Sequence, residues 1–326
     1  MRWRQTAHLE EVEDVPMDDA NIPTSSGRTG RATLAKLRQV GPTGAWPALF
    51  TLGNLVAGFA AIHFATKPAS IAADPSTYVG PWGWSTLTMA ASLVLLGILL
   101  DSVDGSVARL TDSVTELGGQ LDSLSDLVTF GVAPAFIMLN LLSQYIAGTE
   151  GMPMVGPDTG LALGKLCWGV AAIFVCCAAL RLARFNVETA SGQLGDHMVF
   201  RGLPTPGAAG AVVGPVLLHE HLLALQTGDP SSILGVLAGA MVLVLPLVAL
   251  LAAIMMVSNV PYRHLANRYL RVSVSFPYLV GVAAILCVAI WWLQETLAIV
   301  FLWYLLSGPA GMFKHRLSDD GQEGAA

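Results

Sequence analysis

Four aspartates lie at the ends of two neighbouring apolar segments of the sequence. They are Asp101, Asp104, Asp122 and Asp126. Because helical residues turn by about 100° each, Asp101 and Asp104 share one face of a helix. Asp122 and Asp126 share one face of the next helix. Carboxylates packed together repel unless they take up protons or bind cations, and all-oxygen ligand sets suit Mg²⁺, Mn²⁺ or Ca²⁺. We therefore expect the two faces to meet in a metal site.

The composition is that of a membrane protein. Hydrophobic residues make up 54% of the 326 residues, whereas charged residues make up 12%. About 20 helical residues cross the hydrocarbon core of a bilayer. The apolar runs predict an all-α, polytopic transmembrane bundle of about eight spans, with a six-helix catalytic core and a C-terminal pair. The expected spans are residues 46–66, 84–104, 118–146, 162–185, 204–226, 232–257, 276–294 and 296–313, the last two divided by a short turn at Gln294 and Glu295.

The basic residues predict the orientation. With a cytoplasmic N-terminus and an even number of spans, every lysine and arginine except Lys67 and Lys165 falls on the cytoplasmic side, in agreement with the positive-inside rule. Both termini and the aspartates are then expected at the cytoplasmic face of the cell membrane. Residues 1–45 are expected to form a polar tail, whose basic part either remains disordered or lies on the anionic leaflet as an interfacial helix. Residues 46–313 form the predicted membrane domain, and residues 314–326 a C-terminal tail.

Other classes of protein are disfavoured. The four cysteines lie inside apolar spans, so they indicate neither a disulfide framework nor a zinc site. No Walker-type phosphate loop is present, and no GxGxxG turn follows a strand. The net charge of −6 and the apolar bulk argue against a nucleic-acid partner.

The acidic segment fits the pattern DxxDGxxARx8GxxxDxxxD, through which the chain resembles the CDP-alcohol phosphotransferases. The positions are Asp101, Asp104, Gly105, Ala108, Arg109, Gly118, Asp122 and Asp126. The resemblance implies two divalent metals, Mg²⁺ or Mn²⁺ with Ca²⁺ as a further option, which bridge the pyrophosphate of a CDP-linked donor while an alcohol displaces CMP. It implies that all four aspartates are metal ligands and that Asp126 is also the candidate general base. A homodimer is implied by the resemblance alone.

The donor-binding candidates come from the first span and from this pattern. They are Thr51, Asn54, Gly105, Ala108, Arg109 and Gly118. The small residues allow a nucleotide to approach the helix backbone closely. Arg109 pairs either with a donor phosphate or with a neighbouring carboxylate. In the first span, Ala48 stands where many relatives carry Asn, so any contact from that side chain is lost.

Four further segments resemble the membrane-embedded phosphatidylserine synthases of bacteria and archaea. They are FTLGNLVAGFAAI at 50–62, QLDSLSDLVTFGVAPA at 120–135, ALRLARFN at 179–186 and FRGLPTPGAAG at 200–210. This resemblance implies CDP-diacylglycerol as donor and L-serine as acceptor, with membrane lipids as further partners. The implied products are phosphatidylserine and CMP.

Serine is a small zwitterion, so its carboxylate needs a cation in the site. Arg181 and Arg184 are the expected partners, because three residues of spacing puts both on one helix face. Arg201 either joins them or anchors the chain to lipid headgroups. Asn186 either accepts from the ammonium group or has an ordinary role at a helix end.

Two other functions fit the same residues. A sister enzyme would use glycerol 3-phosphate or an inositol phosphate as acceptor. A membrane cation transporter would also account for carboxylates within apolar segments. The Gly and Ala-Arg residues between the aspartates favour an enzyme, because transport gives no reason for them.

Overall fold

The chain folds into helices. The computed structural model describes residues 45–67, 84–110, 116–147, 156–158, 160–190, 202–225, 233–260, 262 and 291–323. Within these ranges every regular element is helical, which confirms the expected all-α class. The elements are α2 (Ala45–Ala65), α3 (Thr86–Leu110), α4 (Glu116–Asp126), η3 (Leu127–Val132), α5 (Ala133–Ala147), α6 (Ala162–Ala190), α7 (Thr205–Leu225), α8 (Ile233–Val257) and α11 (Leu293–Glu323).

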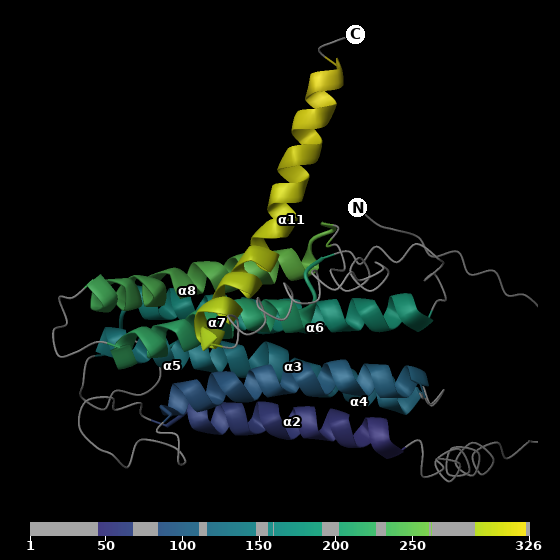
Figure 1. Cartoon of the computed structure of the whole chain (residues 1–326), viewed down its shortest axis with the longest axis horizontal. Coiled ribbons are helices and arrows are strands. Elements are labelled where there is room, and N and C mark those ends of the chain that lie inside the picture. Colours follow the sequence, from purple (N-terminus) through teal and green to yellow (C-terminus); the bar gives the residue numbers. More distant parts are fainter. Residues whose placement is uncertain are drawn as a thin grey trace, which may run out of the picture. The chain divides into compact units, whose positions relative to one another are not determined.

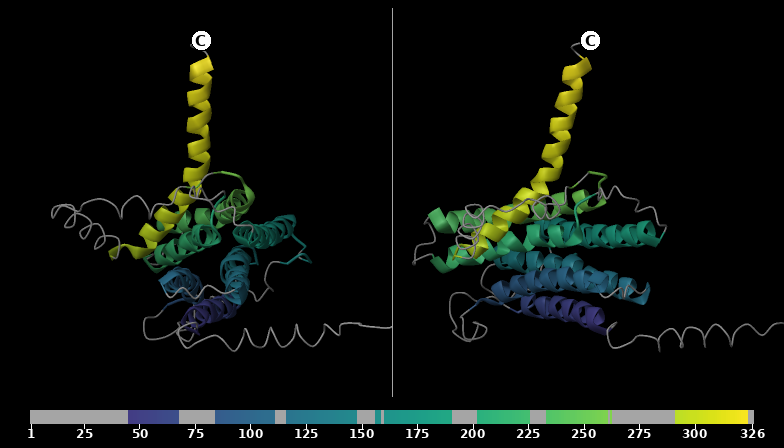
Figure 2. Two further views of the ribbon diagram at one scale, coloured as in Figure 1. Left: turned by 90° about the vertical axis from the view of Figure 1, so that its right-hand side faces the viewer. Right: turned by 45° about the vertical axis from the view of Figure 1, so that its right-hand side comes forward.

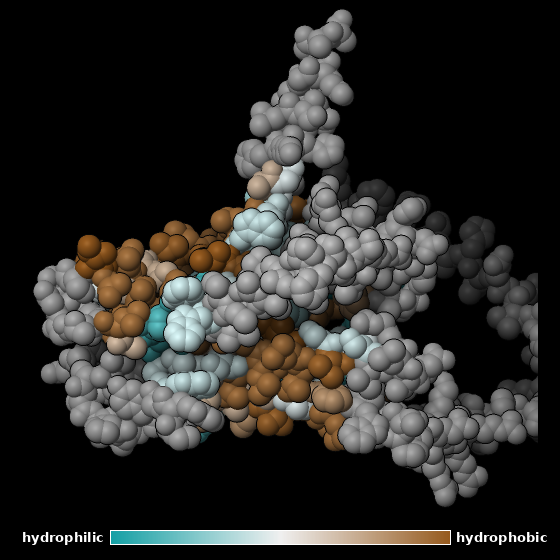
Figure 3. Space-filling model, in the orientation of Figure 1, coloured by the Kyte–Doolittle hydropathy of each residue, from teal (hydrophilic) through white to brown (hydrophobic). Residues whose placement is uncertain are grey.

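Six described segments are long and apolar enough to cross a membrane. They are Ala48–Ala65, Thr86–Ser106, Leu117–Tyr145, Ala162–Glu188, Thr205–Leu225 and Ile233–Val257. Each coincides with one of the first six expected spans. Where described residues reach the face shown in Figure 3, many of them are apolar (brown), and Phe59, Leu99 and Leu243 are 71%, 63% and 67% exposed. Such a surface is solvated by lipid rather than by water, so the chain is a multi-pass membrane protein.

The C-terminal part differs from the expectation. Residues 276–290 of the predicted seventh span lie outside the described residues, as does the N-terminal tail. The predicted eighth span, 296–313, lies within the longer helix α11, which is not among the six segments. A turn at Trp292 precedes α11, so the division expected at Gln294 and Glu295 lies two residues earlier, and both residues fall in the first turn of α11. An acidic residue is favourable at a helix N-terminus, and His221 Nε2 lies 3.1 Å from Glu295 Oε1. The helix also continues through most of the predicted tail, because polar residues such as Lys, Arg, Gln and Glu are good helix formers.

The spanning helices run side by side in Figures 1 and 2. Helix α2 packs along α3, and α6 packs against α8. Helix α7 has neighbours on several sides, because it packs against α3, α5, α8 and α11. Many residues of α7 are small and buried, including Gly207, Gly210 and Gly214. Small residues let helix backbones approach closely where lipid gives no hydrophobic drive for association.

Helices α2, α3 and η3 meet at two glycines. A Cβ atom on Gly58 would lie 2.7 Å from Thr129 Cα, and one on Gly97 would lie 2.7 Å from Asn54 Oδ1. Both distances are shorter than ordinary carbon contacts, so only glycine allows the three helices to come this close. The crossing holds α2 against the segment that carries Asp126.

The helix that follows Asp126 widens into a π-helical turn, η3, before it continues as α5. Such turns inside α-helices are frequent at functional sites. Two hydroxyls, one on each side of Asp126, bond to the backbone of α2: Ser125 Oγ at the end of α4 donates to Thr51 O at 3.0 Å, and Thr129 Oγ1 in η3 donates to Asn54 O at 2.9 Å. Carbonyls of α2 thereby fix the position of Asp126 along the bundle.

Candidate metal centre and substrate pocket

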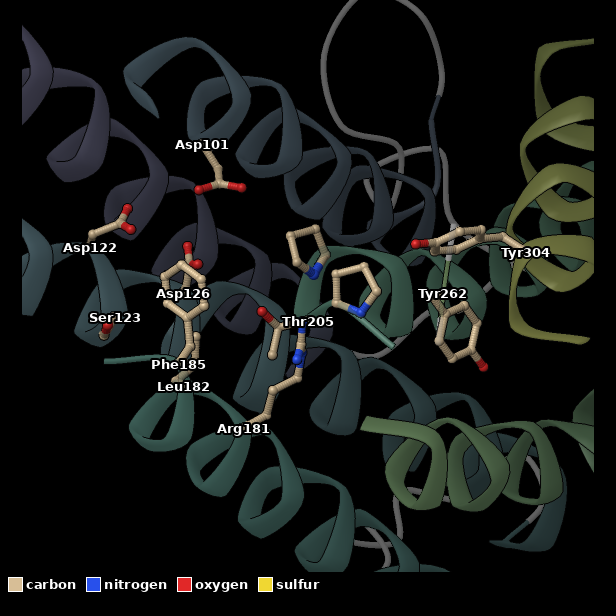
Figure 4. A pocket seen from close by; sticks show the side chains of 12 residues that line it. Asp101, Asp122, Ser123, Asp126, Arg181, Leu182, Phe185, Thr205, Tyr262 and Tyr304 are labelled. Atoms are coloured by element: carbon tan, nitrogen blue, oxygen red, sulfur yellow. The ribbon is translucent and has the colours of Figure 1, made fainter. Parts of the chain in front are cut away.

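Three of the four aspartates converge, Asp101 from α3 and Asp122 and Asp126 from α4. One carboxylate oxygen from each of Asp101, Asp122 and Asp126 lies within 4.8 Å of the others. Figure 4 shows the three side chains converging. Asp126 is buried, with 7% of its surface exposed, and the other two are partly buried. The two acidic helix faces expected from the sequence therefore do face each other.

Asp104 lies beside this cluster but faces α2. It is 5% exposed, and its Oδ2 accepts a hydrogen bond of 2.9 Å from Thr51 Oγ1. It remains close enough to Asp122 for their charges to interact. Among the described residues, the close group of acidic ligand atoms therefore contains three of the four expected ligands, and Asp104 borders it.

Helix α2 also holds Asp126. Asn54 is completely buried, and its Nδ2 donates a 3.0 Å hydrogen bond to Asp126 Oδ1. An amide donor stabilises the charged form of a carboxylate and restricts its rotation. Thr51 and Asn54, expected as nucleotide contacts, thus orient two of the aspartates.

The arrangement fits a divalent cation. Three carboxylates offer only oxygen ligands, which hard cations prefer. Asp122 Oδ1 is buried and has no hydrogen-bond partner among the described residues. A buried carboxylate oxygen without a partner costs free energy, and a bound cation would remove that cost. Further ligands would have to come from Asp104, the substrate or water.

A pocket opens from the carboxylates towards α6, α7 and α11 (Figure 4). Its lining residues are Asp101, Asp122, Ser123, Asp126, Arg181, Leu182, Phe185, Pro204, Thr205, Pro206, Tyr262 and Tyr304. Arg181 is partly buried and carries the positive charge among them. Among the residues that the structure describes, the pocket therefore has an acidic end, one guanidinium and an aromatic end.

The loop before α7 forms one side of this pocket. Gly202 has φ +86°, which is unfavourable for other residues, and a Cβ there would lie 2.6 Å from Met256 O. Gly202 N donates to Val260 O at 2.8 Å, and Leu203 N donates to Met255 O at 2.9 Å. The end of α8 thus fixes the start of α7, and with it the position of Thr205.

The two arginines expected on one face are separated in the structure. Arg181 lines the pocket. Arg184 does not: its Nε lies 2.7 Å from Glu188 Oε1, and its Nη1 donates to Asn259 Oδ1 at 3.1 Å. Residues three apart on a helix point in directions that differ by about 60° around the axis. Glu188, one turn after Arg184, can therefore hold the Arg184 side chain away from the pocket.

The remaining candidates have other surroundings or fall outside the description. Asn186 is paired with Ser123, from Nδ2 to Oγ at 2.9 Å, and does not line the pocket. Gly105 and Gly118 are partly buried on α3 and α4. The backbone of α3 includes Ala108 and Arg109, but their side chains lie outside the described residues, as does Arg201.

Comparison with known proteins identifies the family. A family model described as CDP-alcohol phosphatidyltransferase matches residues 45–260. A protein from Helicobacter pylori strain J99, named CDP-diacylglycerol–serine O-phosphatidyltransferase, is 31% identical over 223 residues, which are 68% of this chain and 73% of that relative. The chain belongs to the CDP-alcohol phosphatidyltransferase family.

Two further relatives of this phosphatidyltransferase carry the same name. The protein from Methanocaldococcus jannaschii is 33% identical over 218 residues, 67% of this chain and 81% of the relative. The one from Bacillus subtilis is 29% identical over 178 residues, 53% of this chain and 78% of the relative. The expected assignment to this family of transferases is confirmed.

Sequence reasoning missed several pocket residues of the phosphatidyltransferase. Thr205 and its flanking prolines were not among the candidate site residues, although they lie in the segment 200–210 that resembles relatives. Tyr262 and Tyr304 lie beyond residue 260, where the family match ends. Burial raises the pKa of Tyr262 to about 12, and the neighbouring Tyr304 adds to the shift. No local pattern marks these tyrosines, because only the tertiary fold brings them to the aspartates.

Proposed function

We propose that this enzyme transfers a phosphatidyl group from CDP-diacylglycerol to the hydroxyl of L-serine, giving phosphatidylserine and CMP. The observation that carries the proposal is the convergence of Asp101, Asp122 and Asp126 at one end of a pocket that also holds Arg181. The relatives reported above are named for this transfer. The aspartates are proposed to bind a phosphate through a cation, and Arg181 in the same pocket is proposed to bind a small anion.

The acidic end is proposed to hold two divalent ions, Mg²⁺ or Mn²⁺, with Ca²⁺ also compatible with oxygen ligands. Asp101, Asp104, Asp122 and Asp126 are the proposed ligands. When bound, the ions neutralise charge on the donor's pyrophosphate and orient the attacking and leaving oxygens. The partnerless Oδ1 of Asp122 supports this assignment.

Asp126 is proposed to be the general base as well as a ligand. Its Oδ1 accepts a hydrogen bond from Asn54, so Oδ2 is the oxygen proposed to take the proton from the serine hydroxyl. The hydroxyl oxygen then forms a bond to the phosphorus that carries the lipid. The bond from that phosphorus to the CMP oxygen breaks, and CMP leaves with the electron pair. Proton, bonds and charge balance without any further reactant.

The donor nucleotide is proposed to lie along α3 and α4. Gly105, Ala108 and Gly118 are small enough for close approach of a nucleotide to the backbone. Arg109 pairs with a donor phosphate or with a neighbouring carboxylate. Thr51 and Asn54 are proposed to affect donor binding indirectly, because their hydrogen bonds orient two of the aspartates, Asp104 and Asp126.

The acceptor is proposed to bind with its carboxylate at Arg181, because this arginine shares the pocket with the aspartates. Arg184 is a weaker candidate, since Glu188 and Asn259 engage it. Asn186 could assist through Ser123, which lines the pocket. Arg201 remains a proposed contributor from the segment that precedes α7.

We further propose that the aspartates and both termini face the cytoplasm and that the enzyme works as a homodimer. The distribution of lysine and arginine supports the orientation. The dimer rests on the family resemblance. Cysteine labelling from each side of sealed vesicles tests the first proposal, and light scattering of the detergent-solubilised protein tests the second.

Acceptor choice is tested by supplying CDP-diacylglycerol with L-serine, glycerol 3-phosphate or inositol phosphate in separate reactions and identifying the lipid product by mass spectrometry. We expect a lipid product with L-serine. Product from another acceptor, with none from serine, would identify a sister enzyme. Divalent metal flux into vesicles without CMP release would instead support a cation transporter.

A further inference from the structure

The aromatic end of the pocket comes from outside the family match. Tyr262 follows residue 260, and Tyr304 lies on α11, yet both line the pocket together with Asp101 and Arg181. Figure 4 shows the two tyrosines on the far side of Arg181 and Thr205 from the aspartates. The family-wide region therefore supplies the acidic end, and the C-terminal region supplies the opposite wall.

Glycines on α7 set the position of Tyr304. A Cβ on Gly207 would lie 2.9 Å from Tyr304 Cε1, and Gly210 and Gly214 give the same close approach to Phe301 and Ala298. Larger residues at these positions would push α11 away from α7. The close contact places the Tyr304 ring beside the start of α7, where both line the pocket.

Tyr262 packs against the ring of Tyr304 and lines the same end of the pocket. The two ring centroids are 5.5 Å apart, and the planes are inclined by 59°. Tyr262 is 4% exposed, and its hydroxyl donates to Leu305 O at 3.0 Å. That hydroxyl is therefore already used to hold α11, and Gly308 leaves space for the ring.

The hydroxyl of Tyr304, unlike that of Tyr262, has no hydrogen bond to hold it within the described part of the chain. The Tyr304 side chain interacts electrostatically with Arg181. A phenol donor and a guanidinium that line the same pocket suit a carboxylate, which has two oxygens and about four lone-pair sites. Leu182 and Phe185 are also among the lining residues and are apolar, so the described residues of this wall offer few other polar groups to an acceptor.

We propose that Tyr304 is a specificity-determining residue that binds the acceptor carboxylate together with Arg181, and that Tyr262 is a positioning residue that holds it there. This inference rests on the proposed function and extends it. The acceptor hydroxyl then points towards Asp126, at the opposite end of the pocket. A C-terminal helix outside the family-wide region thereby selects a carboxylate-bearing alcohol.

The test compares Tyr304→Phe and Tyr262→Phe with wild type and with a control, Tyr145→Phe. Tyr145 is 46% exposed on α5, and it is not among the pocket residues. Each protein is assayed with L-serine and with L-serinamide, which keeps the hydroxyl and ammonium groups but replaces the carboxylate by a neutral amide. Michaelis constants for the acceptor and for CDP-diacylglycerol are measured separately, and thermal unfolding in detergent checks the fold.

We expect Tyr304→Phe to raise the Michaelis constant for L-serine about tenfold or more, as loss of a hydrogen bond to a charged group does. The constants for L-serinamide and for CDP-diacylglycerol should stay within about twofold, because neither contains the lost partner. Tyr262→Phe should shift the same constant less and also lower the unfolding temperature. Tyr145→Phe should match wild type.

An unchanged Michaelis constant for L-serine in Tyr304→Phe overturns the inference. An equal loss for L-serine, L-serinamide and CDP-diacylglycerol also overturns it, since that pattern indicates a general structural effect. Wild-type protein that forms no serine lipid contradicts the proposed function itself, and the inference falls with it. If the wild-type protein uses serine and Tyr304→Phe leaves the preference for L-serine over L-serinamide unaltered, the inference is wrong but the proposed function stands.

Discussion

Asn54 on α2 donates a 3.0 Å hydrogen bond to Asp126 at the end of α4, although 72 residues separate them in the sequence. The amide engages Oδ1, so the second carboxylate oxygen is the one left for chemistry. Asn54 is fully buried, and its own Oδ1 has no hydrogen-bond partner among the described residues. Helix α2, the first span, therefore fixes the orientation of Asp126, the proposed general base.

Asp126→Asn should lower the turnover number by about 10²–10⁴-fold, the usual cost of losing a general base. Donor binding should persist, because the other aspartates remain. A base must be deprotonated to act, so the wild-type rate should fall as the pH drops through the pKa of Asp126. The variant should lack this acidic limb of the pH–rate profile. Full recovery of activity at high metal concentration would make Asp126 a ligand only, and the base would lie elsewhere.

Asp101→Asn or Asp122→Asn should abolish turnover and weaken metal binding, since each removes a charged ligand from the three-carboxylate group. Binding of Mn²⁺ to the purified protein, followed by electron paramagnetic resonance, measures the second effect independently of activity. The control is Asp158→Asn, an exposed aspartate outside the six spans. Ordinary serine-dependent CMP release by either site variant, at wild-type metal concentrations, would contradict the ligand assignment.

Arg181→Ala and Arg184→Ala form a matched pair on one helix. Arg181 lines the pocket, so its loss should raise the Michaelis constant for serine about tenfold or more and leave that for CDP-diacylglycerol nearly unchanged. The Arg184 side chain is 40% exposed in an ion pair with Glu188, and such pairs contribute less than about 1 kcal/mol. Steady-state kinetics with both substrates decides between them. A larger serine effect from Arg184 than from Arg181 would reverse the assignment.

Gly97→Ala should damage both stability and activity, because the added Cβ would lie 2.7 Å from Asn54 Oδ1. Displacing Asn54 disturbs its bond to Asp126, and overpacking costs about 1–3 kcal/mol. Thermal unfolding and turnover number are both measured. Gly119→Ala is the control, since nothing lies within 4 Å of a Cβ there. If the two variants behave alike, the close crossing of α2, α3 and η3 has no functional importance.

The spans and the aspartates could be predicted because their signals are local. An apolar run of about 20 residues marks a span wherever it packs, and the spacing of Asp101 to Asp126 fixes which helix faces carry the acids. The pairing of Asn54 with Asp126 could not be read in this way, since it depends on how α2 crosses α4. Sequence spacing placed Arg184 in the site, but the ion pair with Glu188 depends on rotamers.

The C-terminal region shows the same limit more clearly. Tyr304 is an ordinary aromatic residue in an apolar segment, and only the glycine face of α7 brings it to the pocket. The turn expected at Gln294 and Glu295 lies two residues earlier, at Trp292, and Glu295 falls in the first turn of α11, where an acidic residue is favourable. Polar residues therefore marked this boundary only to within two residues.

The central claim is that this protein joins serine to a phosphatidyl group at a metal centre built by the aspartates. It is tested most directly by CMP release from purified protein with CDP-diacylglycerol, with and without L-serine and with and without Mg²⁺ or Mn²⁺. We expect CMP only when both serine and metal are present, in equal amount to phosphatidylserine formed. Serine-dependent CMP release that persists in full after chelation of all divalent metal, or no CMP release with serine and metal supplied, would contradict the account.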